Sequence, residues 1–306
     1  MNSHENPHAN HQDIRIGTLV RGTNDPAAMI RRILPYGFEC FALTYWQRID
    51  QRQFLDSIDP IREALSDSDA FISCLNVFGN PLGDEENDAA TLRAWELAID
   101  HASDLGCDLV AGFAGRVRGK PVPESIPRFK EVWSKLADRA AKRGVRIAFE
   151  NCEMGGSWQS GNWNIAFQPA AWELMFEALP ADHVGLEWEP AHQLVQLIDP
   201  WPQLRHWVHK MLHVHGKDAM IKHDVIRETG VHGPVQWADH TMPGKGDCDW
   251  AKIIAMLRQS GYRGTIDIEG WHDPDLRGDL EMTGQVFALN YLKTCRGGPY
   301  VPVESR

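Results

Sequence analysis

The chain has 306 residues, of which 43% are hydrophobic and 24% are charged, and its formal net charge is −11. This composition is typical of a globular protein, and it excludes a fibrous chain, an unfolded chain and a small disulfide-bonded domain. The negative charge opposes binding to nucleic acid and to acidic membrane surfaces, so we expect neither partner. Nine of the 14 His lie between His183 and His240, a clustering that average composition does not produce.

The beginning of the chain is polar and carries several His, without the apolar stretch of a secretory signal. We expect residues 1–13 to form a loosely ordered N-terminal tail. No apolar run approaches the length of about 18 residues that a membrane-spanning helix needs. The six Cys are scattered and form no CxxC pair, as is usual for reduced thiols. We therefore expect a cytoplasmic protein.

Short apolar segments alternate with longer amphipathic segments along nearly the whole chain. Eight short segments are predicted as strands: 14–20, 38–44, 70–76, 109–113, 146–150, 183–189, 211–215 and 264–269. The segments between them have helical spacing: 26–34, 58–65, 89–105, 123–143, 169–178, 192–208, 250–260 and 280–294. In segment 123–143 the apolar residues recur every three or four positions, which is the period of a helix with one buried face.

Eight strand–helix units in one chain predict an α/β fold, a single (β/α)8 TIM barrel formed by residues 14–306. An open, doubly wound sheet is the alternative, but that fold usually has a glycine-rich phosphate turn after its first strand. Residues 20–23, Val-Arg-Gly-Thr, contain no such turn. No stretch of the chain has the composition of a linker, so one domain is expected.

In a TIM barrel the active site lies at the C-terminal ends of the strands. The last four predicted strands end in side chains that can bind a metal: Glu150; Glu187 and Glu189; His213 and His215; and Glu269. Carboxylates gathered at one mouth repel each other unless a cation lies among them. We therefore predict one divalent metal ion. Oxygen-rich ligands favour Mn²⁺ or Mg²⁺, and Zn²⁺, Co²⁺ and Fe²⁺ are compatible.

The segments FEN, EPAH, HVHGKDA and IDIEG around these residues resemble the xylose-isomerase-like sugar isomerase/epimerase barrels. That superfamily includes tagatose-type ketose 3-epimerases, hydroxypyruvate isomerase, inosose dehydratase and endonuclease IV, and the resemblance covers roughly residues 14–292. It implies that His215, rather than His213, binds the metal. The full ligand set that it implies is Glu150, Glu189, His215 and Glu269.

One segment departs from the family pattern. Where the family usually has Asp followed by Pro-Ser-His, this chain has Glu followed by Pro-Ala-His at 189–192. The extra methylene of Glu189 moves the carboxylate by roughly 1.5 Å, the length of one C–C bond. Glu187 therefore stays open as an alternative ligand.

A metal site of this kind binds a sugar carbonyl and its neighbouring hydroxyl, and it acidifies the adjacent C–H bond. A carboxylate then removes the proton and gives a metal-stabilised cis-enediolate. The resemblance implies that Glu150 and Glu269 are the catalytic pair on opposite faces of the substrate. The predicted function is a metal-dependent sugar isomerase or epimerase acting on a small ketose or keto-polyol.

Two other functions use related chemistry. A lyase on the same scaffold, such as an inosose-type dehydratase or an eliminase of a keto-sugar or oxidised glycoside, is the first alternative. A repair enzyme like endonuclease IV is a remote alternative, because it uses additional His ligands that the third and fourth predicted strands lack.

Further residues are predicted to bind a sugar-derived small molecule. The resemblance assigns a substrate hydroxyl to His192, and Arg116 is expected to hold an anionic substrate group. Aromatic side chains at strand ends suit the C–H faces of a sugar. The complete set of predicted substrate-binding residues is His192, Lys217, Asn76, Arg116, Trp46, Trp188 and Trp271. The loop 223–240 is predicted to cover the pocket, and a homo-oligomer, dimer or tetramer, is expected.

Overall fold

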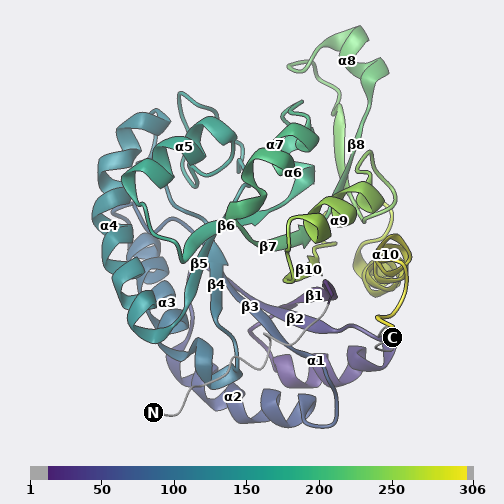
Figure 1. Cartoon of the computed structure of the whole chain (residues 1–306). Coiled ribbons are helices and arrows are strands. Elements are labelled where there is room, and N and C mark those ends of the chain that lie inside the picture. Colours follow the sequence, from purple (N-terminus) through teal and green to yellow (C-terminus); the bar gives the residue numbers. More distant parts are fainter. Residues whose placement is uncertain (1–12, 302–306) are drawn as a thin grey trace.

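The computed structural model describes residues 13–301, and it shows eight parallel strands closed into one barrel (Figure 1). Each predicted strand overlaps one strand of the barrel, so the predicted (β/α)8 barrel is confirmed. The barrel strands are β1 (Arg15–Arg21), β2 (Cys40–Trp46), β3 (Phe71–Phe78), β4 (Leu109–Gly112), β5 (Arg146–Glu150), β6 (Val184–Trp188), β7 (Met211–Gly216) and β10 (Thr265–Ile268). Around the barrel the order is β1-β10-β7-β6-β5-β4-β3-β2. The tail predicted for residues 1–13 lies, except for Asp13, outside the described residues.

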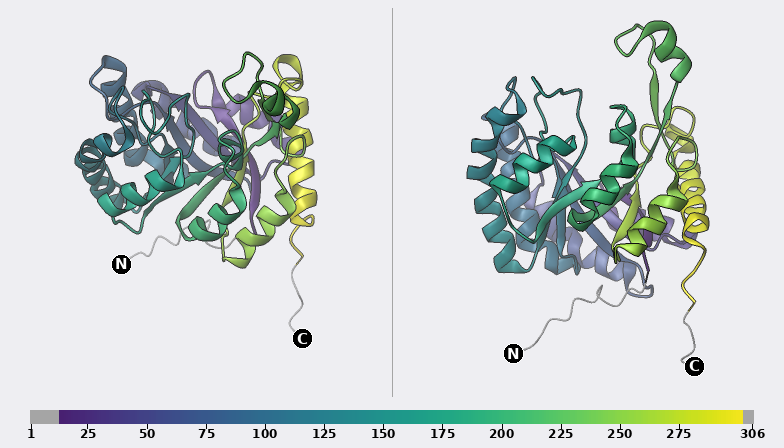
Figure 2. Two further views of the ribbon diagram at one scale, coloured as in Figure 1. Left: turned by 90° about the horizontal axis from the view of Figure 1, so that it is seen from above. Right: turned by 45° about the horizontal axis from the view of Figure 1, so that its top comes forward.

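Helices surround the barrel on its outside (Figures 1 and 2). They are α1 (Pro26–Ile33), α2 (Gln51–Leu65), α3 (Glu86–His101), α4 (Val122–Arg143), α5 (Pro169–Ala178), α6 (Pro190–Leu194), α7 (Pro200–Trp207), α9 (Trp250–Gln259) and α10 (Glu281–Arg296). Short 3-10 helices follow at Leu34–Tyr36, Ala102–Leu105, Val208–Lys210 and Gly278–Leu280. Among the described residues, none of these helices combines the length and apolar character needed to cross a membrane.

Helix α4 has the amphipathic pattern read from the sequence. Phe129, Val132 and Trp133 lie on its buried face and join the main hydrophobic cluster between barrel and helices. The helix ends at Gly144, whose φ of 68° is in the left-handed region that glycine adopts without strain. All six cysteines are free thiols, and five of them are buried.

The continuous helix predicted for 192–208 is wrong, because the segment forms two short helices, α6 and α7. Pro200 begins the second helix, where its missing N–H needs no partner. The side chain of Asp199 caps the same end by accepting a hydrogen bond from the Trp201 amide at 2.9 Å. Leu197 before it has a φ of 56°, which a helix interior does not allow.

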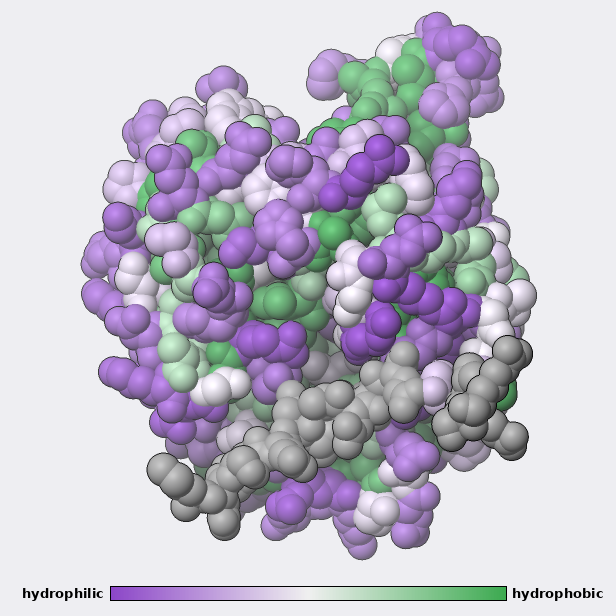
Figure 3. Space-filling model, viewed as in Figure 1, coloured by the Kyte–Doolittle hydropathy of each residue, from purple (hydrophilic) through white to green (hydrophobic). Residues whose placement is uncertain are grey.

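An arm projects beyond the barrel after β7 (Figures 1 and 2). It consists of the antiparallel strands β8 (Asp218–Ile221) and β9 (Ala238–Thr241) with α8 (His223–Thr229) between them. The arm exposes Met220, Val231 and Val235, and hydrophobic surface is visible along it in Figure 3. Of the residues between 223 and 240, only His240 lines the cavity described below. The prediction that this loop covers the pocket is therefore wrong.

Candidate metal centre and active site

Four side chains from neighbouring strands converge at the C-terminal end of the barrel. Glu150 ends β5, Glu189 follows β6, His215 lies in β7, and Glu269 follows β10. All four are buried, and one ligand atom from each lies within 4.8 Å of the others. Around His215 Nδ1, carboxylate oxygens lie at 2.9 Å (Glu150 Oε1), 3.4 Å (Glu189 Oε2) and 3.3 Å (Glu269 Oε2). We call these four residues the quartet.

Several polar atoms of the quartet are buried without a hydrogen bond of good geometry. Both carboxylate oxygens of Glu189, Oε2 of Glu269 and Nδ1 of His215 lack a hydrogen-bond partner within the described chain. A buried, unsatisfied carboxylate is costly, since it loses its hydration without compensation. The quartet therefore fits a divalent cation at the point where these atoms meet. Three carboxylates and one imidazole suit a hard, oxygen-preferring ion.

The other nitrogen of His215 faces the barrel interior. Its Nε2 lies 3.0 Å from Glu187 Oε1 and 3.1 Å from the Asn76 side-chain nitrogen. Carboxylates in this position fix the tautomer and the ring orientation of a metal-binding histidine. Glu187 therefore supports His215 from behind, while Glu189 points its oxygens into the quartet. Asn76, which was predicted to bind substrate, is fully buried beside His215 and does not line the cavity.

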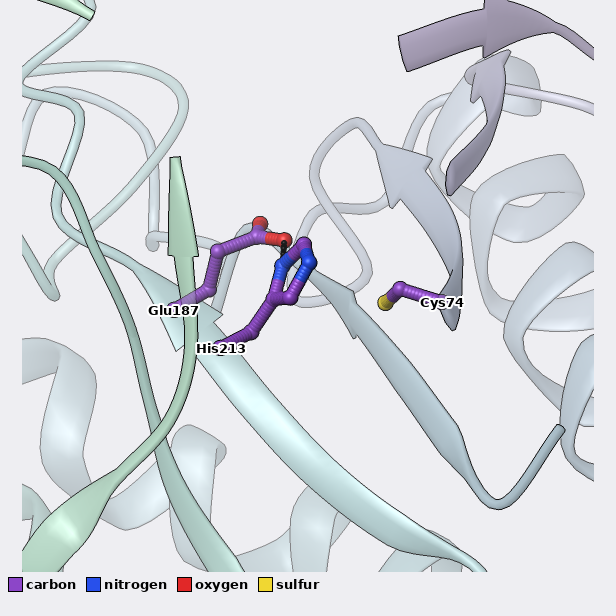
Figure 4. A group of neighbouring side chains, drawn as sticks. All are labelled: Cys74, Glu187 and His213. Atoms are coloured by element: carbon purple, nitrogen blue, oxygen red, sulfur yellow. Dashed lines mark hydrogen bonds and ion pairs between the residues drawn. The ribbon is translucent and has the colours of Figure 1, made fainter. Parts of the chain in front are cut away.

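Polar groups continue below the quartet through the middle of the barrel. Figure 4 shows Glu187 and His213 facing one another, with Cys74 across from them on β3. His213 Nδ1 lies 2.7 Å from Glu187 Oε1, and its Nε2 lies 2.6 Å from Asp267 Oδ2. Burial alone would lower the pKa of His213, but these two carboxylates outweigh it and raise the pKa. Asp267 also accepts hydrogen bonds from Ser73, Thr265 and Cys40.

A lysine and a histidine lie on the cavity side of the quartet. Lys217 Nζ is 3.1 Å from Glu269 Oε1 and 3.3 Å from Glu189 Oε1. His192 Nε2 is 3.1 Å from Glu189 Oε1, while its Nδ1 is 3.0 Å from Glu153 Oε2. Burial would lower the pKa of Lys217, but the facing carboxylates raise it, so this side chain is a fixed positive charge. Both residues can donate hydrogen bonds to substrate oxygens.

The environments of Glu150 and Glu269 push their pKa values in opposite directions. Burial dominates at Glu150 and raises the pKa of its carboxyl above the ordinary value. At Glu269 burial acts in the same sense, but Lys217 and His215 outweigh it and hold the pKa well below the ordinary value. Pairs of carboxylates whose pKa values are separated in this way can serve as acid and base.

A cavity of about 410 Å³ opens above the quartet, and Glu150, Glu269, Lys217 and His192 all line it. Four aromatic side chains also line it, and we call them the aromatic wall: Trp46, Phe78, Phe113 and Trp271. Aromatic rings can pack against the C–H faces of a sugar, and polar side chains can bind its hydroxyls. The cavity is large enough for a monosaccharide-sized molecule.

Residues 30–291 match the family of xylose isomerase-like TIM barrels. The chain belongs to this family. A 3-dehydroshikimate dehydratase of Pseudomonas aeruginosa is 30% identical over 188 residues, which cover 60% of this chain and 26% of that protein. An inosose dehydratase of Clostridium tetani is 26% identical over 186 residues, which cover 58% and 60% of the two chains. The chain thus spans less than two thirds of the length of these curated relatives.

Solved structures share the fold of this family member. A 3-keto-D-glucoside 4-epimerase of E. coli has a TM-score of 0.68 and 15% identity, and the match covers 92% of this chain and 100% of that one. A D-tagatose 3-epimerase-like protein has a TM-score of 0.67 and 16% identity, with 93% and 99% covered. At such low identity these likenesses show the barrel fold.

Besides Asn76, two predicted substrate-binding residues do not line the cavity of this xylose isomerase-like barrel. Trp188 is fully buried in the main hydrophobic cluster, and its Nε1 donates to Gln193 Oε1 at 2.9 Å. Arg116 is also buried, and its guanidinium donates hydrogen bonds to backbone carbonyls. Those carbonyls belong to Lys120, Ser157 and Trp158. Both side chains serve the fold, so neither is retained as a candidate for substrate binding.

The structure brings residues to the cavity that the sequence analysis did not select. Glu153, His240 and His272 all line it. Glu153 and His272 lie three residues after Glu150 and Glu269 in the loops that follow β5 and β10. Their positions at the barrel rim were readable from the predicted strands. His240 lies in β9 of the arm, and the sequence analysis did not predict this strand.

Proposed function

We propose that this protein is a divalent-metal-dependent sugar isomerase or epimerase that moves a proton at the carbon next to the carbonyl of a small ketose or keto-polyol. The observation that carries the proposal is the quartet, which converges beside the cavity and in which buried ligand atoms of Glu189, His215 and Glu269 lack hydrogen-bond partners within the described residues. The family and the epimerase-type fold agree with this chemistry.

The quartet would hold the cation, with Mn²⁺ or Mg²⁺ preferred by its ligand types. When bound, such a cation supplies Lewis acidity to a sugar carbonyl and its neighbouring hydroxyl. Glu150 and Glu269 enter the cavity from β5 and from the end of β10, which are separated around the barrel by β6 and β7. They therefore approach a substrate from different sides, so one can remove the proton and the other can return it.

Lys217 and His192 complete the polar wall in this proposal. The fixed positive charge of Lys217 stabilises negative charge that develops on a substrate oxygen when the neighbouring carbon loses its proton. His192 is held by Glu153 at 3.0 Å, which orients the ring toward the cavity. The aromatic wall excludes water and positions the ring of the sugar.

A lyase is the second candidate, because both curated relatives named above are dehydratases. The first step would be the same proton removal. Loss of a hydroxyl from the next carbon, with a proton donated to the leaving oxygen, would then replace reprotonation. Water and an unsaturated ketone would be the products.

One experiment tests the proposal and separates the two reactions. The purified protein is stripped of metal, reloaded with Mn²⁺, Mg²⁺, Zn²⁺, Co²⁺ or Fe²⁺, and incubated with ketoses and keto-polyols in D₂O. We expect deuterium at the carbon next to the carbonyl without loss of water, and we expect Glu150→Gln and Glu269→Gln to abolish it. A dehydrated product would instead establish the lyase.

The control variant is Glu131→Gln on the exposed face of α4, which removes one negative charge far from the cavity. Absence of bound cation, together with exchange that both active-site variants leave intact, would refute the mechanism. The expected dimer or tetramer stays a prediction, which light scattering of the purified protein would measure.

A further inference from the structure

A second cavity of about 410 Å³ adjoins the proposed active site. Three aromatic residues, Trp46, Phe78 and Trp271, line both cavities and form the wall that they share. A molecule that reaches across this wall would have one part above the quartet and another part in the second cavity. The two cavities therefore lie next to each other along these three side chains.

The two cavities differ in the charge of their lining residues. Acidic side chains line the first cavity, whereas the second is lined by Arg21 and Arg48 and by no acidic residue. Arg21 ends β1, and Arg48 lies two residues after the end of β2, so both follow the first two strands at the rim. This pair is a local concentration of positive charge in a chain whose net charge is −11.

Neither arginine is neutralised within residues 13–301. Arg21 lies over the ring of Trp271, with 5.6 Å between the guanidinium carbon and the ring centre. Arg48 donates one hydrogen bond, to the uncharged Asn87 Oδ1 at 2.5 Å. In the described part of the chain neither has a carboxylate within ion-pair distance, so both retain donors for an incoming anion.

The lining of the second cavity combines guanidinium groups with aromatic rings. Planar guanidinium groups bind carboxylates and phosphates through paired hydrogen bonds. Ring faces beside them pack against the carbon chain that carries such a group. The lining therefore suits an anion attached to a sugar-like body.

We propose that the second cavity is a subsite for an anionic group, a carboxylate or a phosphate, on the substrate whose carbonyl lies above the quartet. The inference rests on the proposed function and narrows its substrate class to keto-sugars or keto-polyols with an anionic substituent. A nucleic acid backbone does not fit this role, because the rest of the surface is acidic and repels a polyanion.

The test measures calorimetric binding to the Mn²⁺-loaded protein of three six-carbon ketones. They are D-fructose, D-fructose 6-phosphate and 5-keto-D-gluconate, which are neutral, phosphorylated and carboxylated. We expect at least one anionic ligand to bind tenfold or more tightly than D-fructose, since hydrogen bonds to charged groups contribute about this much. Salt should reduce the preference, and the better ligand identifies the group as phosphate or carboxylate.

The double variant Arg21→Gln/Arg48→Gln should lower the affinity for the anionic ligand to that for D-fructose, and the affinity for D-fructose should not change. That unchanged affinity also shows that the variant is folded. Arg52→Gln is the matched control, because Arg52 is an exposed arginine on α2 paired with Asp56. Equal binding of all three ketones, or a preference that survives in the double variant, overturns the subsite.

The outcomes separate this inference from the proposed function. If Mn²⁺ binds and deuterium exchange occurs without any preference for anionic ketones, the subsite fails and the proposed function stands. If no cation binds in the quartet while the arginine-dependent preference for an anion persists, the proposed function fails and the subsite stands.

Discussion

Glu187→Gln tests whether a residue that touches no substrate controls the metal centre. Glu187 Oε1 lies 2.7 Å from His213 Nδ1 and 3.0 Å from His215 Nε2, and the residue is fully buried. With a cation in the quartet, the carboxylate would hold the proton of His215 on Nε2, which would leave the lone pair of Nδ1 for the cation. Glutamine keeps the volume of the side chain and removes its charge.

The expected change in metal affinity and in stability follows from the contacts that Glu187→Gln removes and those that it leaves. Replacing a carboxylate that supports a metal-binding histidine lowers metal affinity by about 10- to 100-fold, or about 1.4 to 2.7 kcal/mol. His213 keeps its contact with Asp267 at 2.6 Å, so the polar interior retains one charged pair. The glutamine oxygen can still accept a hydrogen bond, so loss of the charge at the two contacts of Glu187 costs about 1–3 kcal/mol of folding free energy. That is less than the stability of a typical domain, about 5–15 kcal/mol, so the barrel stays folded.

Calorimetric titration of the metal-free variant with Mn²⁺ measures the affinity, and circular dichroism checks the fold. Glu131→Gln is the control, since it removes the same charge from an exposed position on α4. We expect weaker Mn²⁺ binding for Glu187→Gln alone. Affinity equal to that of the unmodified protein would refute the argument that Glu187 sets the tautomer of His215.

Three further variants test the packing, the pH dependence and the cavity. Trp133→Ala should lower the free energy of unfolding in urea by about 3–5 kcal/mol, because the ring is fully buried and donates to the Ala114 carbonyl at 2.8 Å; a loss below about 1 kcal/mol would contradict this. Burial raises the pKa of Glu39, but hydrogen bonds from Arg296 and a backbone amide outweigh it and lower the pKa below 4.5. Glu39→Gln should therefore be less stable than the unmodified protein at pH 7, and the difference should disappear as the pH falls through the lowered pKa; a difference that grew in acid would reverse the assigned sign. Trp46→Ala should weaken ketose binding about fivefold to tenfold with little change in stability, because the ring is 51% exposed; unchanged binding would remove the ring from the proposed site.

The barrel was predictable because strand and helix segments alternate regularly along the chain, and the quartet was predictable because its residues lie at or near the ends of these strands. Parallel strands in a barrel all end at the same mouth, so the residues that end them are neighbours in space. Alternation along a strand separates Glu187 and Glu189 from Trp188, which packs outside in the main hydrophobic cluster. The choice between the two glutamates needed coordinates, because both lie on the same face of their strand.

The side chains that the sequence misplaced depend on loops and long-range contacts. Arg116 follows β4 and has the charge to bind an anion, but its guanidinium donates hydrogen bonds to the backbone carbonyls of residues 157 and 158. Arg21 and Arg48 have the same chemistry without such partners. The local sequence does not show whether the guanidinium of an arginine is hydrogen-bonded within the protein, because the acceptor atoms belong to residues far away in the sequence.

The polar interior of the barrel limits how this sequence can change. Glu187, His213 and Asp267 stand where TIM barrels usually place branched apolar residues. Exchange of any one of them for an apolar residue would leave a charged neighbour buried without a counterpart. The three positions can therefore become apolar only as a set. Directed evolution of this protein toward new substrates should find its tolerated changes in the rim loops, while this part of the interior stays fixed.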